Sequence, residues 1–175
     1  MPVRQYASAR RAAAATQTRR AILGAARRLL SDTPGGPSVG AIARLAGVSR
    51  LSVYHHFGSR AGVLAAVAAE AGSPKPGTTG DLRAFVAAAV AHWVTDPALF
   101  RRVPEMPVAT HELASRLAAE DRLRPGCSLK EAEDVIAVVT SFAAFDRLHQ
   151  DGRRSTAAVT EILMRMAASI LSPHT

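Results

Sequence analysis

The side chains best suited to chemistry lie between residues 38 and 60, in the segment SVGAIARLAGVSRLSVYHHFGSR. Guanidinium, hydroxyl, phenol and imidazole groups are concentrated there, and no carboxylate accompanies them. An arginine can pair bidentately with phosphate or with a guanine edge, and an exposed aliphatic side chain can contact a thymine methyl group. The segment therefore has the chemistry of a surface that binds nucleic acid.

Two short helices separated by a tight turn are expected to position these groups. Ile42 and Ala46 lie on one apolar face of the first helix, and Gly47 can adopt the left-handed conformation that reverses the chain. Ser49 follows as the N-cap of a second helix, residues 50–57. A helix, a glycine turn and a capped second helix form the helix-turn-helix pattern, whose second helix enters the DNA major groove.

The distribution of charge supports a polyanionic partner. Residues 1–60 contain ten arginines, no lysine and one acidic residue, Asp32, which gives a net charge of +9. The remaining 115 residues have twelve basic and thirteen acidic side chains, a net charge of −1. Because binding to phosphates releases counterions, a basic domain gains affinity for DNA. All of the excess positive charge lies in one third of the chain, which favours DNA binding over a generally basic surface.

The segment resembles the DNA-binding domain of the TetR family of bacterial transcription regulators. The resemblance runs from TRRAILGAARRLL through YHHF and Gly58-Ser59-Arg60 to AGVLAAV. It implies a dimeric repressor that leaves its operator when a small, largely apolar ligand binds. The implied partners are double-stranded DNA with an inverted repeat, a second copy of the chain and an unknown small-molecule effector. Neither a cofactor nor a metal is expected.

Helix geometry predicts which side chains meet the DNA. The first residues of the second helix lie nearest the bases, and residues around them fix the register through phosphates. The candidate base readers are Arg50, Leu51 and Ser52. The remaining candidates for DNA contact are Ser38, Ser49, Tyr54, His55 and Arg60. The TetR-like pattern often has Gly or Thr around positions 51 and 52, so the departure here leaves the operator sequence unpredicted.

Composition and patterning predict an all-α protein in which an N-terminal three-helix helix-turn-helix domain is followed by a helical bundle, with about nine helices in total. The chain is 48% hydrophobic and 5% aromatic, and no alternating Val, Ile and Thr runs indicate strands. The expected helices span approximately residues 16–30, 39–46, 50–57, 60–71, 82–95, 97–103, 110–124, 129–150 and 156–171.

Three regions are expected along the chain. Residues 1–15 are a flexible basic arm, which either reaches DNA or only adds solubility. Residues 16–72 are the helix-turn-helix DNA-binding domain with the start of the connecting helix. A loop rich in Gly, Pro and Thr then leads to residues 81–175, the ligand-binding and dimerisation domain.

The resemblance further implies an apolar pocket within the C-terminal bundle. The candidates for its lining are Phe85, His92, Trp93, Phe100, Met106, His111 and Phe142. Wide apolar faces on the last two predicted helices favour a dimer interface, although they would also serve as the core of one chain. The candidates for this interface are Val135, Val139, Phe142, Phe145, Val159, Leu163, Met166 and Ile170.

Other classes of protein are less well supported. The sequence has no glycine-rich phosphate loop, GxSxG elbow or HExxH motif, so an enzyme is not expected. The single cysteine, Cys127, fits a reducing cytoplasm and leaves a redox sensor as a minor option. No long uncharged apolar window predicts a membrane span. Two alternatives remain: a constitutive or architectural DNA-binding protein whose C-terminal half only dimerises, and a helical small-molecule carrier or enzyme without DNA binding.

Overall fold

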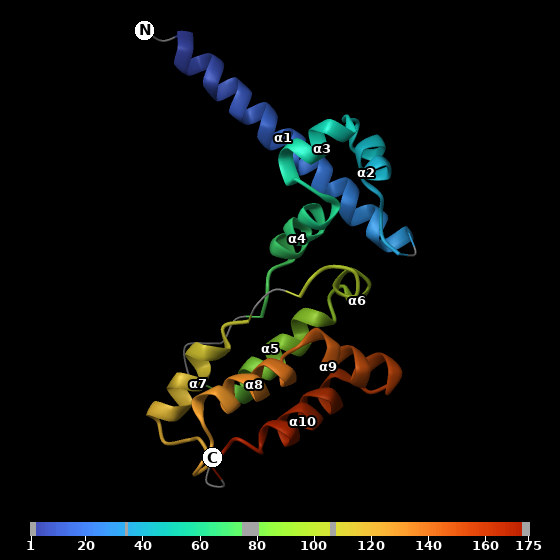
Figure 1. The fold of residues 1–175 in the computed structure, drawn as a ribbon. Coiled ribbons are helices and arrows are strands. Elements are labelled where there is room, and N and C mark those ends of the chain that lie inside the picture. Colours follow the sequence, from blue (N-terminus) through green and yellow to red (C-terminus); the bar gives the residue numbers. More distant parts are fainter. Residues whose placement is uncertain (1–2, 34, 75–80, 106–107, 173–175) are drawn as a thin grey trace. The chain divides into compact units, whose positions relative to one another are not determined.

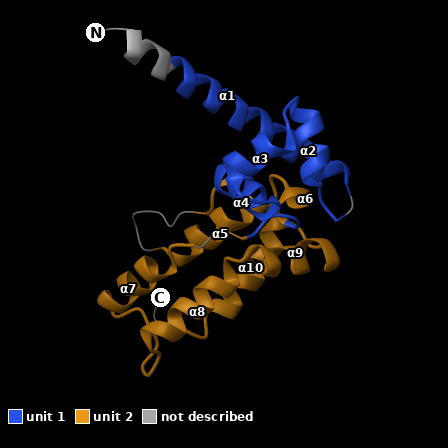
Figure 2. Cartoon of the chain, turned by 45° about the horizontal axis from the view of Figure 1, so that its top comes forward, with its two compact units in different colours: residues 1–71, 101–104 blue, residues 72–100, 105–175 orange. Residues whose placement is uncertain are grey.

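The structure is a computed structural model that describes residues 3–33, 35–74, 81–105 and 108–172, with only the backbone described for residues 3–9. The chain divides into two compact units (Figure 2). Unit 1 comprises residues 1–71 and 101–104, and unit 2 comprises residues 72–100 and 105–175. Within the described ranges, the secondary structure consists of ten α-helices, one π-helical turn and a single antiparallel bridge between Leu123 and Leu171.

Unit 1 is built from four helices around a small apolar core (Figure 1). They are α1 (Val3–Asp32), α2 (Val39–Ala46), α3 (Arg50–Phe57) and α4 (Arg60–Ala71). Helix α1 packs against α2 and α4, and α3 packs against α2 and α4. The fully covered side chains at the centre are Ile22, Ala26, Ile42, Val53, Val63 and Val67.

Helix α1 begins at Val3 and not near Thr16, so the flexible arm expected over residues 1–15 is instead helical from residue 3. The segment is rich in alanine and arginine, which are strong helix formers, and contains no glycine or proline between Val3 and Leu23. The packed part of α1 supplies a nucleus from which the helix extends residue by residue. Thr16 lies inside this helix, where its hydroxyl donates to the Ala12 carbonyl at 2.9 Å.

Unit 2 is a helical bundle. Its elements are α5 (Leu82–Trp93), α6 (Pro97–Phe100), α7 (Thr110–Ala119), α8 (Leu129–Val139), α9 (Phe142–Asp146), the π-helical turn η1 (Arg147–Asp151) and α10 (Thr156–Ala167). Helix α10 packs against α5 and α8, and α7 packs against α8. The bundle core includes Leu82, Phe85, Trp93, Leu113, Ile136, Phe145 and Leu163.

The single helix predicted over residues 129–150 is wrong, because the chain breaks after Val139. The Trp93 indole N–H donates to the Thr140 carbonyl at 2.9 Å, and the Glu105 carboxylate accepts the Phe142 N–H at 2.8 Å. Both backbone groups are thereby removed from the hydrogen bonds of a continuous helix. Ser141 then caps α9 by accepting the Ala144 N–H at 3.1 Å.

Helices α5 and α6 end slightly earlier than predicted, at Trp93 and Phe100, and helices α7 and α10 end well before their predicted bounds, at Ala119 and Ala167. The C-terminal continuations of α7 and α10 pair with each other: Arg124 N–H donates to the Ile170 carbonyl, and Ser172 N–H donates to the Arg122 carbonyl, both at 2.9 Å. This pairing satisfies backbone groups that a longer helix would otherwise use. None of the described helices has both the length and the apolar character that crossing a bilayer requires.

Candidate nucleic-acid interface

Serine caps and a glycine turn shape the α2–α3 pair, and the cap at Ser49 and the turn at Gly47 are as predicted. Ser38 Oγ accepts the Ala41 N–H at 3.1 Å, and Ser49 Oγ accepts the Ser52 N–H at 3.0 Å. Gly47 has φ of 68°, in the left-handed region, and its N–H closes the end of α2. A local hydrogen bond therefore fixes the first turn of α3, and the turn that leads into α3 has a backbone conformation that favours glycine.

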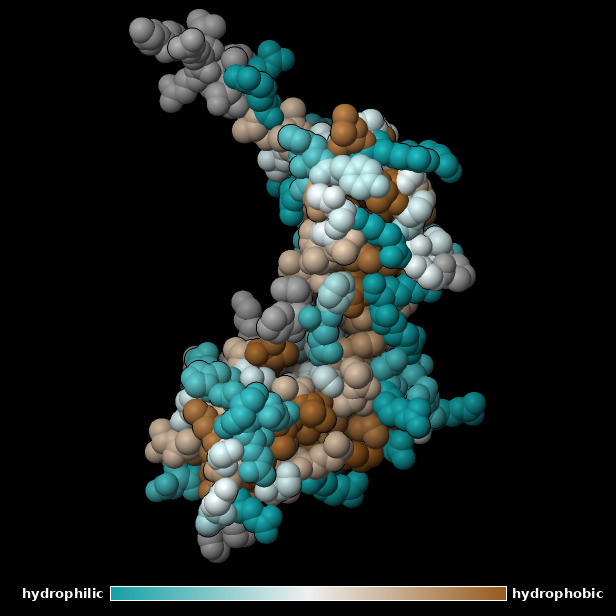
Figure 3. All heavy atoms as spheres, viewed as in Figure 1, coloured by the Kyte–Doolittle hydropathy of each residue, from teal (hydrophilic) through white to brown (hydrophobic). Residues whose placement is uncertain are grey.

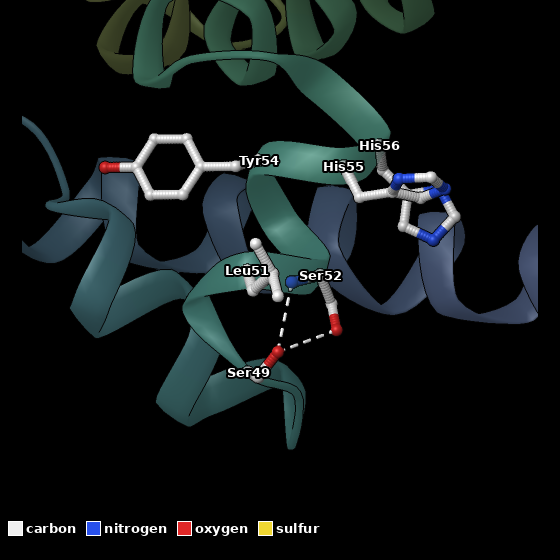
Figure 4. Close-up of a pocket in the computed structure, with 6 residues that line it drawn as sticks. All are labelled: Ser49, Leu51, Ser52, Tyr54, His55 and His56. Carbon is white, nitrogen blue, oxygen red and sulfur yellow. Dashed lines mark hydrogen bonds between the residues drawn. The ribbon is translucent and has the colours of Figure 1, made fainter.

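Helix α3 places one side against the core of unit 1 and the other in solvent. Val53 is fully buried, whereas Leu51 is 77% exposed and Tyr54 is 49% exposed. Figure 4 shows that Tyr54 points away from His55 and His56, with Ser49 and Ser52 joined at the start of the helix. These residues line a hollow along α3. An exposed leucine beside hydroxyl, phenol and imidazole groups suits the mixed surface of a DNA groove.

The last turn of α3 is fixed by an arginine from α1. Arg19 lies over the Phe57 ring, with its guanidinium carbon 4.5 Å from the ring centroid, and its Nη1 donates to the His56 carbonyl at 3.5 Å. His56 is half-buried, and its ring packs against those of His55 and Phe57. A cation at the C-terminus of a helix also interacts favourably with the helix dipole. Sequence reasoning counted Arg19 only as charge and missed this positioning role.

Arg60 makes hydrogen bonds within unit 1, and the phosphate contact predicted for it stays a prediction. Its Nε donates to the Pro37 carbonyl and its Nη2 to the Gly35 carbonyl, both at 2.8 Å. A Cβ on Gly36 would lie 2.7 Å from Arg60 Nη2, so the glycine leaves room for the guanidinium. Arg60 therefore holds the loop that leads into Ser38 and α2 with two of its five N–H groups.

Arg102, which lies outside the DNA-binding domain predicted over residues 16–72, also supports this loop. Arg102 follows α6 in the sequence but belongs to unit 1, where its Nη1 donates to the Leu30 carbonyl and, at 2.9 Å, to the Thr33 carbonyl. These carbonyls lie at and just beyond the C-terminal turn of α1, where they lack partners within the helix. No local sequence signal identified Arg102, since its partners are about 70 residues away in the chain.

The three predicted base readers differ in their surroundings. Leu51 points into solvent, and the Ser52 hydroxyl lies 2.9 Å from the Ser49 hydroxyl. The guanidinium of Arg50 lies against the backbone of Gly40 in α2. Tyr54 and His55 remain exposed and available to a ligand on the same helix.

Four of the predicted pocket residues form one aromatic cluster in unit 2. The ring centroids of His92 and Trp93 are 4.7 Å apart, those of Trp93 and Phe100 are 4.8 Å apart, and those of Trp93 and Phe142 are 5.7 Å apart. Phe85 is fully buried two turns earlier on α5. In this arrangement the rings pack against one another, so a ligand would have to separate them.

The other two predicted pocket residues are not part of this cluster. The His111 side chain is 74% exposed on α7, and its Nδ1 lies 2.6 Å from the Glu133 carboxylate. Helix α7 thus turns the His111 side chain toward solvent, and its predicted place in an apolar pocket finds no support here. Met106 lies outside the described residues.

Two titratable groups of unit 2 are affected by burial. Burial lowers the pKa of His92, and a hydrogen bond to the Gly72 backbone partly offsets that shift. The Nε2 atom of His92 is buried without a hydrogen-bond partner among the described residues. Burial, followed by the nearby Glu131, raises the pKa of the Cys127 thiol. A raised pKa disfavours the reactive thiolate, which argues against a redox sensor.

Most of the predicted dimer-interface residues are core residues of a single chain. The buried ones are Val139, Phe142, Phe145, Val159, Leu163 and Ile170. The bundle of unit 2 already covers these faces within one chain, so their place in a dimer interface stays a prediction. Val135 is half-buried, and Met166 is 47% exposed. Val138, on α8, is 53% exposed, and apolar atoms reach the visible surface of unit 2 in Figure 3.

Among the residues that the structure describes, no three His, Cys, Asp or Glu side chains gather in a way that could hold a metal ion. The site is instead defined by a capped helix, a glycine turn and an exposed helix face on a basic unit. This is the construction of a helix-turn-helix DNA-binding protein.

The comparisons with known proteins agree with this class. Residues 22–75 match the sequence model of the bacterial regulatory proteins of the tetR family. No curated protein matches the chain. The chain is similar to NalD from Pseudomonas aeruginosa, the secondary repressor of the MexAB-OprM multidrug efflux pump, with 20% identity and a TM-score of 0.60 over 92% of this chain and 99% of that chain.

It is also similar to TylP, a TetR regulator from Streptomyces fradiae, with 18% identity and a TM-score of 0.63 over 91% of this chain and 89% of that chain. The structural likeness shows a shared fold, and the match over residues 22–75 assigns the N-terminal domain. The helix-turn-helix part of the chain, residues 22–75, is therefore a tetR-family domain. This match supports a DNA-binding transcription regulator.

Proposed function

We propose that this protein is a dimeric, sequence-specific repressor that binds an inverted-repeat operator and is released by a small, largely apolar ligand. The exposed face of α3 is the observation that carries the proposal. Leu51, Tyr54 and His55 point outward from a helix that is anchored through Val53 and capped by Ser49. The net charge of +9 on residues 1–60 supplies the attraction to phosphates.

Dimerisation follows from the geometry that an inverted repeat demands. Two copies related by a two-fold axis present two recognition helices to successive major grooves. The exposed apolar side chains Val138 on α8 and Met166 on α10 support these two helices as the contact surface. Their exposure leaves apolar area that a second copy of the chain can cover.

Release by a ligand requires that unit 2 influence the DNA-binding unit. The chain crosses between the units at Ala71–Gly72 and on either side of residues 101–104. The aromatic cluster around Trp93 lies on α5, α6 and α9, and Phe100 directly precedes the segment that carries Arg102. A ligand that separates these rings would favour a different conformation of that segment, which is the differential binding that allosteric release needs.

The N-terminal part of α1 adds basic groups to the interface. We propose that Arg4, Arg10 and Arg11 act with the reading helix on DNA phosphates, in the cytoplasm where bacterial DNA lies. No acidic residue precedes Asp32.

The first experiment is selection of bound fragments from random duplex DNA with the purified full chain, followed by titration at two salt concentrations. We expect enrichment of an inverted repeat, with an affinity that falls steeply as salt increases. Weak, salt-sensitive binding without an enriched sequence would instead support an architectural DNA-binding protein. Absence of DNA binding would support a helical small-molecule carrier.

A further inference from the structure

The contact between Gly40 and Arg50 connects the two helices of the reading motif. Gly40 lies in the first turn of α2, and Arg50 is the first residue of α3. A Cβ on Gly40 would lie 2.9 Å from Arg50 Nη2, 3.1 Å from Nε and 3.2 Å from Cζ. The guanidinium therefore occupies the space in which any other residue at position 40 would carry its side chain.

The backbone around Gly40 cannot easily move to accommodate a larger residue. Helix α2 is capped by Ser38, and its Ile42 and Ala43 side chains are buried in the core. Arg50 is exposed, and the far end of an arginine side chain can change rotamer. A side chain at position 40 would therefore displace the Arg50 guanidinium and leave α2 in place.

The orientation of the Arg50 guanidinium matters because its N–H groups can still donate hydrogen bonds to a ligand. Arg60 spends two donors on carbonyl oxygens, whereas Arg50 makes no hydrogen bond within the described part of the chain. A guanidinium reads guanine through a planar pair of N–H groups, so a change in its approach changes the base edge that it can reach. Arg50 is also at the N-terminus of the recognition helix, where side chains meet base edges.

We propose that Gly40 determines the base preference of this protein indirectly, by leaving open the place that the Arg50 guanidinium occupies. The inference rests on the proposed function as a sequence-specific DNA-binding protein. Gly40 is a positioning residue, and Arg50 is the residue that touches DNA. Arg50 reads its base pair from the side of α2, and the residue type at position 40 sets that direction.

The test compares Gly40→Ala, Arg50→Ala and the double variant with the unchanged full chain. Each protein is titrated, at one fixed salt concentration, against the operator selected by the unchanged protein and against all its single-base variants. Gly24→Ala is the matched control, because Gly24 also lies inside a helix but a Cβ there would have nothing within 4 Å. Alanine favours a helix over glycine, so the melting temperatures of both glycine variants should equal or exceed that of the unchanged protein.

We expect Arg50→Ala to reduce the preference at one position in each half-site by about fivefold or more, as the loss of one bidentate arginine–guanine pair predicts. Gly40→Ala should change the preference at that same position and at no other. In the Arg50→Ala background, the Gly40 substitution should change no preference by more than about twofold, since the two residues act through one contact.

Three results would overturn the inference: an equal loss of affinity on every sequence, an unchanged preference, or the same effect of Gly40→Ala with and without Arg50. A failure of the proposed function is distinguishable, because the unchanged protein would then select no sequence at all, and both conclusions would fall together.

Discussion

At the scale of single residues, the arginines of unit 1 perform two separate tasks. Arg19, Arg60 and Arg102 donate hydrogen bonds to backbone carbonyls and fix the ends of helices and the loop before α2. Arg50 keeps its donors free for a ligand. The planar guanidinium suits both tasks, because it carries five donors in a fixed geometry. The positive charge of the domain thus also organises the surface that binds DNA.

Tyr54 tests how α3 contacts the DNA backbone. We expect Tyr54→Phe to weaken binding by about five- to tenfold on all sequences alike, because it removes one hydrogen bond to a charged phosphate. Leu51→Ala is the comparison, since loss of an apolar contact to a thymine methyl group should act at particular positions only. Affinities for the operator and its single-base variants measure both effects. A loss for Tyr54→Phe that is confined to certain bases would contradict its role at phosphate.

His92 is expected to make stability depend on pH. Its pKa is lowered by burial in the folded state and is about 6.5 in the unfolded chain. The unfolded state therefore binds the proton more readily, so the contribution of neutral His92 is complete above about pH 6.5 and is lost as pH falls through the folded pKa. Urea unfolding from pH 8 to pH 5 should show that His92→Phe flattens this part of the profile. Parallel profiles for the two proteins would exclude the effect.

At the scale of elements, the position of α3 depends on how closely α4 approaches it. A Cβ on Gly62 would lie 2.0 Å from the Phe57 carbonyl oxygen, which is a backbone atom at the end of α3. Ser59 lies between the two helices, and its hydroxyl accepts the Gly62 N–H at 3.0 Å. The absence of a side chain at position 62 therefore permits the tight turn that places the reading helix on the core.

Gly62→Ala should destabilise unit 1 by about 1–3 kcal/mol, because the new methyl group collides with backbone and not with a flexible side chain. Gly24→Ala, in an open helical position, should instead stabilise the protein by about 0.5–1 kcal/mol. Thermal and urea unfolding of the two variants measure the contrast. If both substitutions stabilise the protein equally, the close approach of α4 to α3 does not constrain the fold.

At the scale of the whole molecule, the basic N-terminal helix and the apolar surface of unit 2 suit different partners. Residues 10–17 of α1 are exposed and precede Ile22, the first residue of the family match. On unit 2, Val138 and Met166 are large apolar side chains that remain in solvent. The basic part of α1 suits a polyanionic partner, and the exposed apolar side chains of unit 2 suit contact with another copy of the chain.

Removal of residues 1–15 should leave the fold intact, because the buried core of unit 1 begins at Ile22. Operator affinity should fall, and the dependence of log affinity on log salt should become less steep by about one unit for each phosphate that the shortened chain no longer binds. Titrations of the full and shortened chains over a range of salt concentrations measure this slope. Identical slopes would show that the segment takes no part in binding.

If the protein is the dimer that we propose, Val138→Glu combined with Met166→Glu should convert it to a monomer, because the charges would be buried in an apolar interface. Operator affinity should then fall by about 100-fold or more, since the two half-sites can no longer be bound simultaneously. Val94→Glu is the control, because it alters an exposed apolar residue next to α5, outside α8 and α10. Analytical ultracentrifugation gives the oligomeric state. A dimer that persists in the double variant would place the interface elsewhere.

The sequence by itself determined the reading motif, because its signals act over three or four residues. The cap at Ser49 and the turn at Gly47 are confirmed, and the caps at Ser38, Asp81, Ser128 and Ser155 are of the same local kind. Each is a hydrogen bond or a backbone conformation set by neighbours in the chain. For the same reason, α3 and α4 begin and end where the sequence predicts.

Only the tertiary structure decided the remaining features, because their partners lie far away in the chain. Trp93 and Glu105 interrupt the helix predicted through Thr140, from positions 47 and 37 residues distant. The bundle also buries apolar faces that periodicity alone could not assign to a core or to an interface. Arg50 and Arg60 have the same side chain, yet one remains open to DNA and the other is bound to carbonyls. Residue type fixes what a side chain can bind, and the packing around it fixes what it does bind.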